Sequence, residues 1–185
     1  MSEVPSEGWD SRSLENFADR AGFEPEGDGD RTGQNGGENA SAQGADGADV
    51  HTWYTTGMAL LDKGSPAAAA QVLQRAATAE PTSRSVREGL ARAQFDTGRY
   101  AEAAANFRVI VEASPADDYA HFGLGLALSR AGEHERAAEY LALAAAMRPD
   151  RKPYIDALRQ VRATIEARKR KAEGGMTKPE DGMRS

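Results

Sequence analysis

Residues 50–151 read VHTWYTTGMALLDKGSPAAAAQVLQRAATAEPTS (50–83), RSVREGLARAQFDTGRYAEAAANFRVIVEASPAD (84–117) and DYAHFGLGLALSRAGEHERAAEYLALAAAMRPDR (118–151). The three segments are equal in length, and residues of the same kind recur at the same places in all of them. The recurring columns are Pro81, Pro115 and Pro149; Gly64, Gly98 and Gly132; Ala69, Ala103 and Ala137; Leu73, Phe107 and Leu141; and Gly57, Ala91 and Gly125. A repeat period of this length, the spacing from Pro81 to Pro115, is typical of proteins that stack one supersecondary unit repeatedly.

Each segment is predicted to form two antiparallel helices joined by a short turn. Gly64 and its equivalents are expected to end the first helix, because the left-handed conformation of a helix end favours glycine. Pro81 and its equivalents are expected to end the second helix, since proline has no amide hydrogen and collides with the preceding turn. The expected helices are 50–63 with 67–80, 85–98 with 100–113, and 118–131 with 133–148.

The columns also predict how the two helices of a pair pack. The column of Gly57 on the first helix and the column of Ala69 on the second hold small residues, which let two backbones approach closely. The column of Leu73 holds large residues that fill the wider gaps. We therefore expect a seam in which small residues face large ones. Overpacking it by Gly57→Leu or Ala103→Phe should cost about 1–3 kcal/mol.

These columns resemble the tetratricopeptide repeat, whose pattern runs Trp-x2-Leu-Gly-x2-Tyr, then Ala-x3-Phe, then Ala, then Pro, over a period of the same length. The matching residues are Trp53, Gly57, Ala69, Leu73, Ala76 and Pro81 in the first repeat, Leu90, Ala91, Gly98, Tyr100, Ala103, Phe107 and Pro115 in the second, and Leu124, Gly125, Gly132, Ala137, Leu141, Ala144 and Pro149 in the third. The chain departs from the pattern at Thr56 and Leu60, and at Arg87 and Gln94, which replace the aromatic positions of the second repeat. The resemblance implies an all-α, right-handed α-solenoid of three helix-turn-helix repeats (50–83, 84–117 and 118–151). It does not imply a particular partner, because one fold serves many functions.

Composition and charge set the limits of what surrounds the repeats. The chain has 185 residues, a net charge of −6 and 39% hydrophobic residues, which suits one folded domain with tails. It has no cysteine, which excludes disulfides, thiolate metal sites and cysteine nucleophiles. The first ten residues lack the apolar run of a secretory signal, and the apolar tracts of the repeats are too short to span a bilayer. We therefore expect a soluble cytoplasmic protein, and the Ala-, Gly-, Asp- and Arg-rich composition suggests a bacterial source.

Residues 1–48 are expected to form an acidic, Gly-rich, disordered tail. They hold 11 acidic and 3 basic residues, and almost no large apolar residue follows Phe23 to offset the entropy of the chain. Within this tail, Leu14, Phe17 and Ala18 fall at helical spacing, which favours a short helix over 11–21. One interpretation is a transient helix. The other is a linear motif that docks into a groove of the same molecule or of a partner.

Residues 152–171 are predicted to form one more helix, which caps the last repeat because a solenoid otherwise exposes its stacking surface. Its expected apolar stripe comprises Ile155, Leu158, Val161, Arg162 and Ile165. The run Arg168-Lys169-Arg170-Lys171 suits the carbonyl end of a helix better than a nucleic-acid site, since no aromatic residues accompany it. We expect no nucleic-acid and no membrane partner, only a weak, salt-screened attraction to the acidic tail. Residues 172–185 are expected to be disordered.

The resemblance implies a concave binding surface lined by the first helix of each pair. The residues predicted to form this protein-binding groove are Tyr54, Met58, Leu61, Glu88, Arg92, Phe95, Tyr119, Phe122, Leu126 and Arg130. For Leu61, Phe95 and Leu126 the alternative is packing between neighbouring helices. Tyr54, Tyr119 and Phe122 are then the strongest candidates for partner contact, because aromatic side chains and methionine suit an apolar helix or peptide.

Two further observations narrow the function. Some tetratricopeptide proteins bind a terminal carboxylate with a Lys/Asn/Arg clamp. The corresponding positions of this chain hold Tyr54, Met58, Gly89, Tyr119 and Gly123, so the clamp is missing. The three histidines, His51, His121 and His134, lack ligands at metal spacing, and no Gly-rich phosphate loop follows a strand.

We therefore predict a non-catalytic adaptor or scaffold without a cofactor, which binds a peptide or amphipathic helix of another protein in the groove. The segment around Leu14 and Phe17 is the internal candidate for the same groove. The alternative is a structural module that homo-oligomerises through the groove or the end helix, and the sequence leaves the oligomeric state open.

Overall fold

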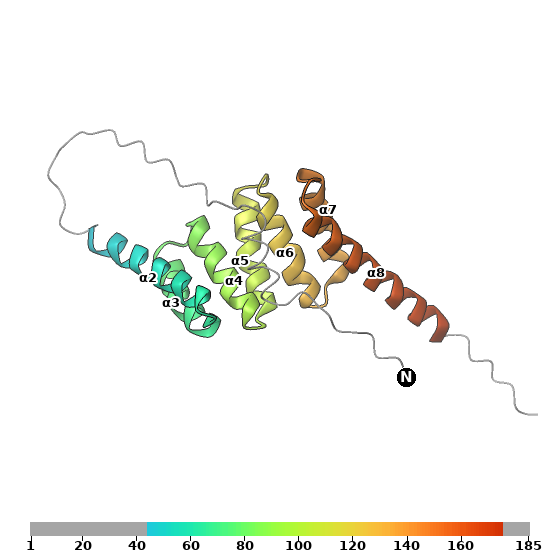
Figure 1. The fold of residues 1–185 in the computed structure, drawn as a ribbon, viewed down its shortest axis with the longest axis horizontal. Helices are drawn as coiled ribbons and strands as arrows, with labels where there is room; N and C mark the ends of the chain where they lie inside the picture. The colour runs from blue at the N-terminus through green and yellow to red at the C-terminus, as the bar shows by residue number, and fades with distance from the viewer. Residues whose placement is uncertain (1–43, 176–185) are drawn as a thin grey trace, which may run out of the picture. The chain divides into compact units, whose positions relative to one another are not determined.

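The computed structural model describes residues 44–175, which form seven helices and no strand (Figure 1). The helices are α2 (Gly44–Asp62), α3 (Pro66–Ala79), α4 (Arg84–Asp96), α5 (Tyr100–Ala113), α6 (Asp118–Arg130), α7 (His134–Met147) and α8 (Lys152–Gly175). The chain divides after Pro115 into two compact units, so that α2–α5 belong to the first and α6–α8 to the second. The predicted all-α class of paired helices is confirmed.

The glycines end the first helices as predicted. Gly64, Gly98 and Gly132 have φ angles of 69°, 77° and 90°, the left-handed region that favours glycine. At the first of these turns, the amide of Gly64 donates to the carbonyl of Leu61 and the amide of Ser65 to that of Leu60, both at 2.8 Å. The other two turns repeat this pattern of hydrogen bonds, which satisfies the last carbonyls of each helix.

The second helices end two residues before each proline of the repeat, and the seam is packed as the columns predicted. A Cβ atom built on Gly125 would lie 2.6 Å from Cγ of Leu141, and one built on Gly57 would lie 2.7 Å from Cδ2 of Leu73. Such distances are well below van der Waals contact, so only glycine fits against these leucines.

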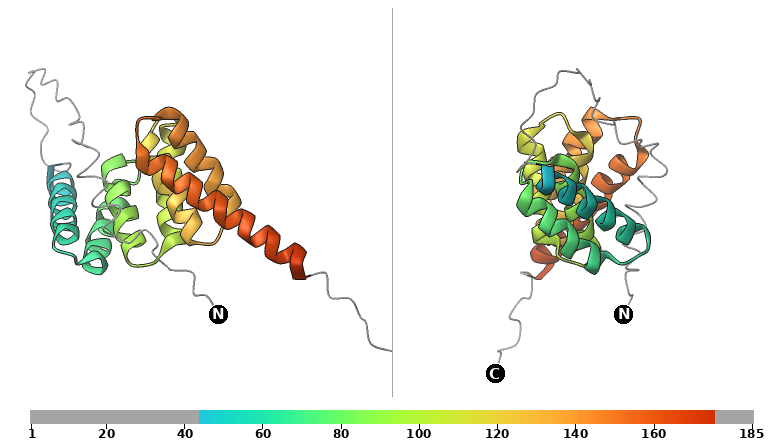
Figure 2. Two further views of the ribbon diagram at one scale, coloured as in Figure 1. Left: turned by 45° about the vertical axis from the view of Figure 1, so that its right-hand side comes forward. Right: turned by 90° about the vertical axis from the view of Figure 1, so that its left-hand side faces the viewer.

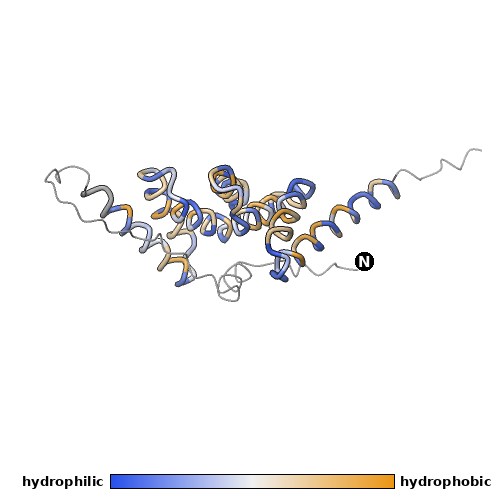
Figure 3. Tube along the Cα trace, turned by 90° about the horizontal axis from the view of Figure 1, so that it is seen from above, coloured by the Kyte–Doolittle hydropathy of each residue, from blue (hydrophilic) through white to orange (hydrophobic). Residues whose placement is uncertain are grey.

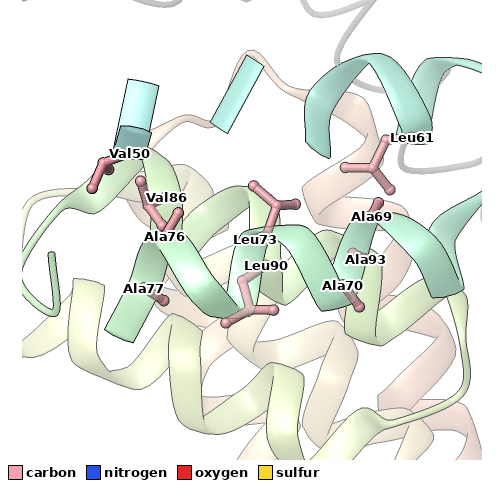
Figure 4. Close-up of a cluster of buried hydrophobic side chains, with 10 residues drawn as sticks. All are labelled: Val50, Leu61, Ala69, Ala70, Leu73, Ala76, Ala77, Val86, Leu90 and Ala93. Carbon is pink, nitrogen blue, oxygen red and sulfur yellow. The ribbon is translucent and has the colours of Figure 1, made fainter. Parts of the chain in front are cut away.

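An alanine-rich core holds the first unit together (Figure 4). Its members come from α2, α3 and α4, and they are Val50, Leu61, Ala69, Ala70, Leu73, Ala76, Ala77, Val86, Leu90 and Ala93. Because most of the residues that α3 contributes are alanines, Leu73 and Leu90 supply the bulk at the centre, and both are fully buried.

A chain of polar side chains replaces the aromatic residues missing from the second repeat. Arg87 donates from Nη1 to Oδ1 of Asn106 at 2.7 Å, and Asn106 donates from Nδ2 to Oε1 of Gln94 at 2.8 Å. Gln94 donates in turn to Glu102 at 3.1 Å. Gln94 and Asn106 are buried between α4 and α5, and their mutual hydrogen bond offsets the cost of removing them from water.

Tyr154 attaches α8 to the rest of the second unit. Its side chain is fully buried, its ring stacks on Phe122 with the centroids 4.5 Å apart, and its hydroxyl donates to Oδ2 of Asp118 at 2.7 Å. The guanidinium of Arg151 lies 5.9 Å from the centre of the Tyr154 ring. The first turn of α8 is therefore fixed to α6 by both stacking and a charge-assisted hydrogen bond.

The stripe predicted for α8 is wrong in its position on the helix. The buried residues are Tyr154, Ala157 and Val161, whereas Ile155 is 36% exposed and Leu158 is half-buried. The prediction omitted Tyr154, which is larger than the residues of the stripe and turns its own side of the helix inward. Of the other two stripe residues, Arg162 is exposed and Ile165 is half-buried. The C-terminal part of α8 extends for several turns past α7 (Figures 1 and 2).

Two predicted boundaries are corrected by the helix bounds. The tail expected over 1–48 overlaps the beginning of α2, which starts at Gly44. The tail assigned to 172–185 is wrong for 172–175, because α8 ends only at Gly175. The short helix predicted over 11–21 lies outside the described residues. No helix between residues 44 and 175 has both the length and the hydropathy of a membrane-spanning segment.

Candidate functional site

The ten residues of the predicted groove differ widely in exposure. Tyr54, Met58, Glu88 and Arg92 are partly exposed, Arg130 is exposed, and Leu61, Phe95, Tyr119, Phe122 and Leu126 are buried. The structure therefore presents to solvent only part of the surface that the sequence predicted.

The buried groove residues of the first unit pack between helices. Leu61 belongs to the core cluster, and the ring of Phe95 meets that of Tyr100 edge to face, with the centroids 5.2 Å apart. Leu126 of α6 is likewise buried in the second unit. These three are the residues for which interhelical packing was the stated alternative, and packing is the role they have in the structure.

The expectation that Tyr119 and Phe122 are exposed for partner contact is wrong. Phe122 has no exposed surface because Tyr154 stacks on it, and Tyr119 is 5% exposed. The repeat itself held a signal for this. Tyr154 lies one repeat period after Ala120, and both residues are buried. Extending the repeat to a fourth period would therefore have predicted that Tyr154 faces α6.

The four partly exposed residues of the first unit form a small surface that we call the α2–α4 patch: Tyr54 and Met58 of α2, with Glu88 and Arg92 of α4. The charges of Glu88 and Arg92 are close enough to Tyr54 to affect the pKa of its phenol. Burial raises the pKa of Tyr54, the negative charge of Glu88 raises it further, and the positive charge of Arg92 opposes both effects. The two charged side chains stand one helical turn apart on the same face of α4, and both charges act on the phenol.

Gly89 sets the depth of the patch. A Cβ atom at this position would lie 3.1 Å from Sδ of Met58 and 3.4 Å from Cδ2 of Leu73, so any larger residue would push Met58 outward. The thioether therefore lies directly on the backbone of α4. A polarizable thioether and a phenol ring, with a carboxylate and a guanidinium nearby, are suited to an apolar side chain with charged neighbours.

The three histidines weighed as catalytic candidates have different surroundings. His51 is exposed on α2, His121 lies against Tyr140 in the second unit with the rings tilted and their centroids 5.9 Å apart, and His134 is buried at the start of α7. Burial lowers the pKa of His134, and the nearby charge of Arg168 lowers it further. Within residues 44–175, no three His, Asp or Glu side chains are grouped closely enough to hold a metal ion.

Solved structures with a similar fold include three informative cases. MamA (residues 41 to the end) from Desulfovibrio magneticus RS-1 is 24% identical, with a TM-score of 0.62 over 68% of this chain and 71% of that one. The second TPR domain of human RPAP3, solved with the HSP70 peptide SGPTIEEVD, is 15% identical, with a TM-score of 0.59 over 63% of this chain and 98% of that one. YrrB, described as a TPR protein with an unusual peptide-binding site, is 24% identical, with a TM-score of 0.57 over 59% of this chain and 56% of that one. At these identities the likeness shows the fold alone.

The sequence itself matches one family. The pattern described as the tetratricopeptide repeat matches residues 54–118 and again residues 89–152, which together cover more than half of the chain. No curated protein sequence matches significantly. Repeats of this kind generally serve as protein-binding surfaces. With its paired helices, its glycine turns and this match, the chain is an all-α solenoid protein that belongs to the tetratricopeptide repeat family.

Proposed function

We propose that this chain is a non-catalytic adaptor that binds a peptide or an amphipathic helix of another protein through the α2–α4 patch. The observation that supports the proposal is the partial exposure of Tyr54 and Met58 on the first helix of one repeat, together with Glu88 and Arg92 of the next repeat, whose charges act on Tyr54. Soluble proteins bury most of their aromatic and thioether surface, so residues of this kind left accessible together are typical of a binding site. The cytoplasmic location stays a prediction from the sequence.

The chemistry of the patch narrows the class of partner. An apolar side chain would lie on Tyr54 and Met58, a cation of the partner would face Glu88, and an anion would face Arg92. The peptide in the human RPAP3 structure ends in the four residues EEVD, three of which are acidic. This chain has Tyr54, Met58 and Gly89 where the resemblance places clamp residues for a terminal carboxylate. We therefore propose an internal or helical segment as the ligand rather than a free C-terminus.

Affinity capture followed by titration tests the proposal. Full-length chain and the double variant Tyr54→Ala/Met58→Ala are used to capture proteins from native lysate, and the partner retained only by the first is purified and titrated calorimetrically. The control is Lys63→Ala/Glu112→Ala, which removes two exposed side chains of the same unit outside the patch. Loss of two central contacts should weaken binding by roughly 30-fold, which corresponds to about 2 kcal/mol.

Two results would refute the proposal. One is equal binding by the patch variant and the control variant. The other is a stable homodimer, detected by light scattering, that the patch variant dissolves, because the patch would then serve self-assembly, the alternative predicted from the sequence.

A further inference from the structure

The repeat register identifies α8 as the first helix of a fourth helix pair. Its buried residues Tyr154, Ala157 and Val161 lie one repeat period after Ala120, Gly123 and Ala127 of α6. All six are buried, and so are Val86, Gly89 and Ala93, which lie one further period earlier, in α4. The same columns thus turn inward in α4, α6 and α8.

The remaining columns of α8 are exposed where those of α6 are covered. Ile155, Leu158 and Arg162 correspond to His121, Leu124 and Leu128, which are buried in the second unit, where α6 pairs with α7. Among the described residues no helix follows α8, so Ile155 is 36% exposed and Leu158 only half-buried. Apolar and polar residues alternate along α8 (Figure 3) until the four successive cations of the run 168–171. We call Ile155, Leu158, Arg159 and Arg162 the α8 outer face.

An ordinary second helix would not fit this face. Arg159 stands where the column has Gly125, and even a single Cβ at Gly125 would collide with Leu141. An occupant must therefore lie farther from α8 than α7 lies from α6, fill the wider gap with large side chains, and accept nearby cations. Arg159 pairs with Asp156 at 2.9 Å, whereas Arg162 forms no ion pair with any residue between 44 and 175.

Charge selects against a second α8 and in favour of an acidic segment. Residues 159–171 hold six cations and a single acid, so two copies of this helix would repel each other. The chain carries its own complement in sequence. Residues 9–23 contain Trp9, Leu14, Phe17 and Phe23, and residues 24–30 add four acids without a base.

We propose that the segment 9–30 of the same chain docks on the α8 outer face. Its aromatic and aliphatic residues cover Ile155 and Leu158, while its carboxylates face Arg159, Arg162 and the run 168–171. Thirteen residues, 31–43, connect the segment 9–30 to Gly44, and they can span at most about 45 Å when fully extended. A segment joined to its target by such a connection acts at an effective concentration on the order of millimolar, so a modest affinity is sufficient. The proposal involves a different unit from the α2–α4 patch and does not depend on it.

Paramagnetic broadening in the full-length chain tests the docking. Because the chain has no cysteine, Ser13→Cys gives a single site for a nitroxide label. In ¹⁵N-labelled protein the amide signals of residues 155–162 should lose intensity and recover when the nitroxide is reduced. Leu14→Asp/Phe17→Asp should abolish the loss, and it changes no described residue. Ile155→Asp should also abolish it, whereas Ala167→Asp, on another side of α8, should leave it unchanged.

Each other outcome contradicts the proposal. Unbroadened α8 signals mean that the segment does not dock there, and broadening at Tyr54 and Met58 means that it occupies the α2–α4 patch. Broadening that appears only when ¹⁵N-labelled, unmodified chain is mixed with unlabelled, spin-labelled chain means that a second copy supplies the segment.

Discussion

Removing one hydroxyl group, by Tyr154→Phe, tests how α8 is attached. The ring that stacks on Phe122 is kept, while the 2.7 Å hydrogen bond to Asp118 is lost. Hydrogen bonds to charged groups contribute about 1.5–3 kcal/mol. The side chain of Asp118 is 25% exposed and lies 4.0 Å from Nε of Arg151, so it is not left without compensation. We therefore expect the low end of the range, about 1.5 kcal/mol.

Amide hydrogen exchange of the full-length chain measures this loss in the second unit, which contains no tryptophan to report unfolding. A loss of about 1.5 kcal/mol corresponds to roughly tenfold faster exchange of the slowest amides of α6 and α8. Tyr140→Phe is the matched control, because Tyr140 is half-buried in the same unit and its hydroxyl has no hydrogen-bond partner among the described residues. Equal exchange rates in the Tyr154 and Tyr140 variants would refute the assigned role of the hydroxyl.

The buried hydroxyl of Tyr154 should also make the stability of the second unit depend on pH. Burial raises the pKa of Tyr154 well above its ordinary value, and the hydrogen bond and negative charge of Asp118 raise it further. The stability that comes from keeping this phenol protonated is complete below about pH 10, the pKa of an unfolded tyrosine, and falls as the pH rises above it. The wild-type second unit should therefore lose up to about 1.4 kcal/mol per pH unit from this group above pH 10. Tyr154→Phe should remove that part of the slope, and an identical alkaline slope in both proteins would contradict the shift.

Three other substitutions test the packing of the repeats. Gly125→Ala should destabilise the second unit by about 1–2 kcal/mol, since overpacking against the buried Leu141 exceeds the gain in helix propensity; unchanged stability in urea unfolding would show that the seam is loose. Asn106→Leu should cost about 1–3 kcal/mol because it leaves the polar groups around Arg87 without their partner, and a neutral result in thermal unfolding would mean that water replaces it. Gly98→Ala, at a φ of 77°, should cost about 1–2 kcal/mol by the same assay although nothing lies near its added methyl group.

The helices could be predicted from the sequence because local chemistry determines where they end. Gly64 and its equivalents adopt the left-handed conformation that ends the first helix of each pair, which other residues rarely adopt. Pro81 and its equivalents prevent the second helix from continuing. Together the glycine and the proline fix where both helices of each pair end. The range predicted for α5, 100–113, agrees with Tyr100–Ala113. At α2 no such residue marks the beginning, and there the prediction was several residues short.

The candidate site was less predictable, because exposure depends on what covers a residue as well as on its position in the repeat. Its position in the repeat assigns Phe122 to the first helix of a pair, where the resemblance implies a binding surface. Its burial depends on Tyr154, which belongs to a later helix, α8, and was left out of the apolar stripe. In the sequence, Arg87 and Gln94 in place of aromatic residues were likewise only a departure from the family pattern. Their compensation by Asn106 is visible only in three dimensions.

The most direct test of the proposed function is a titration of the captured partner onto ¹⁵N-labelled, full-length chain, followed by the amide shifts of every helix. Shift changes that centre on Tyr54, Met58, Glu88 and Arg92 and saturate together are the predicted result. Shift changes confined to α6 and α7, with the α2–α4 patch unaffected, would contradict the proposal that this patch is where the protein binds its partner.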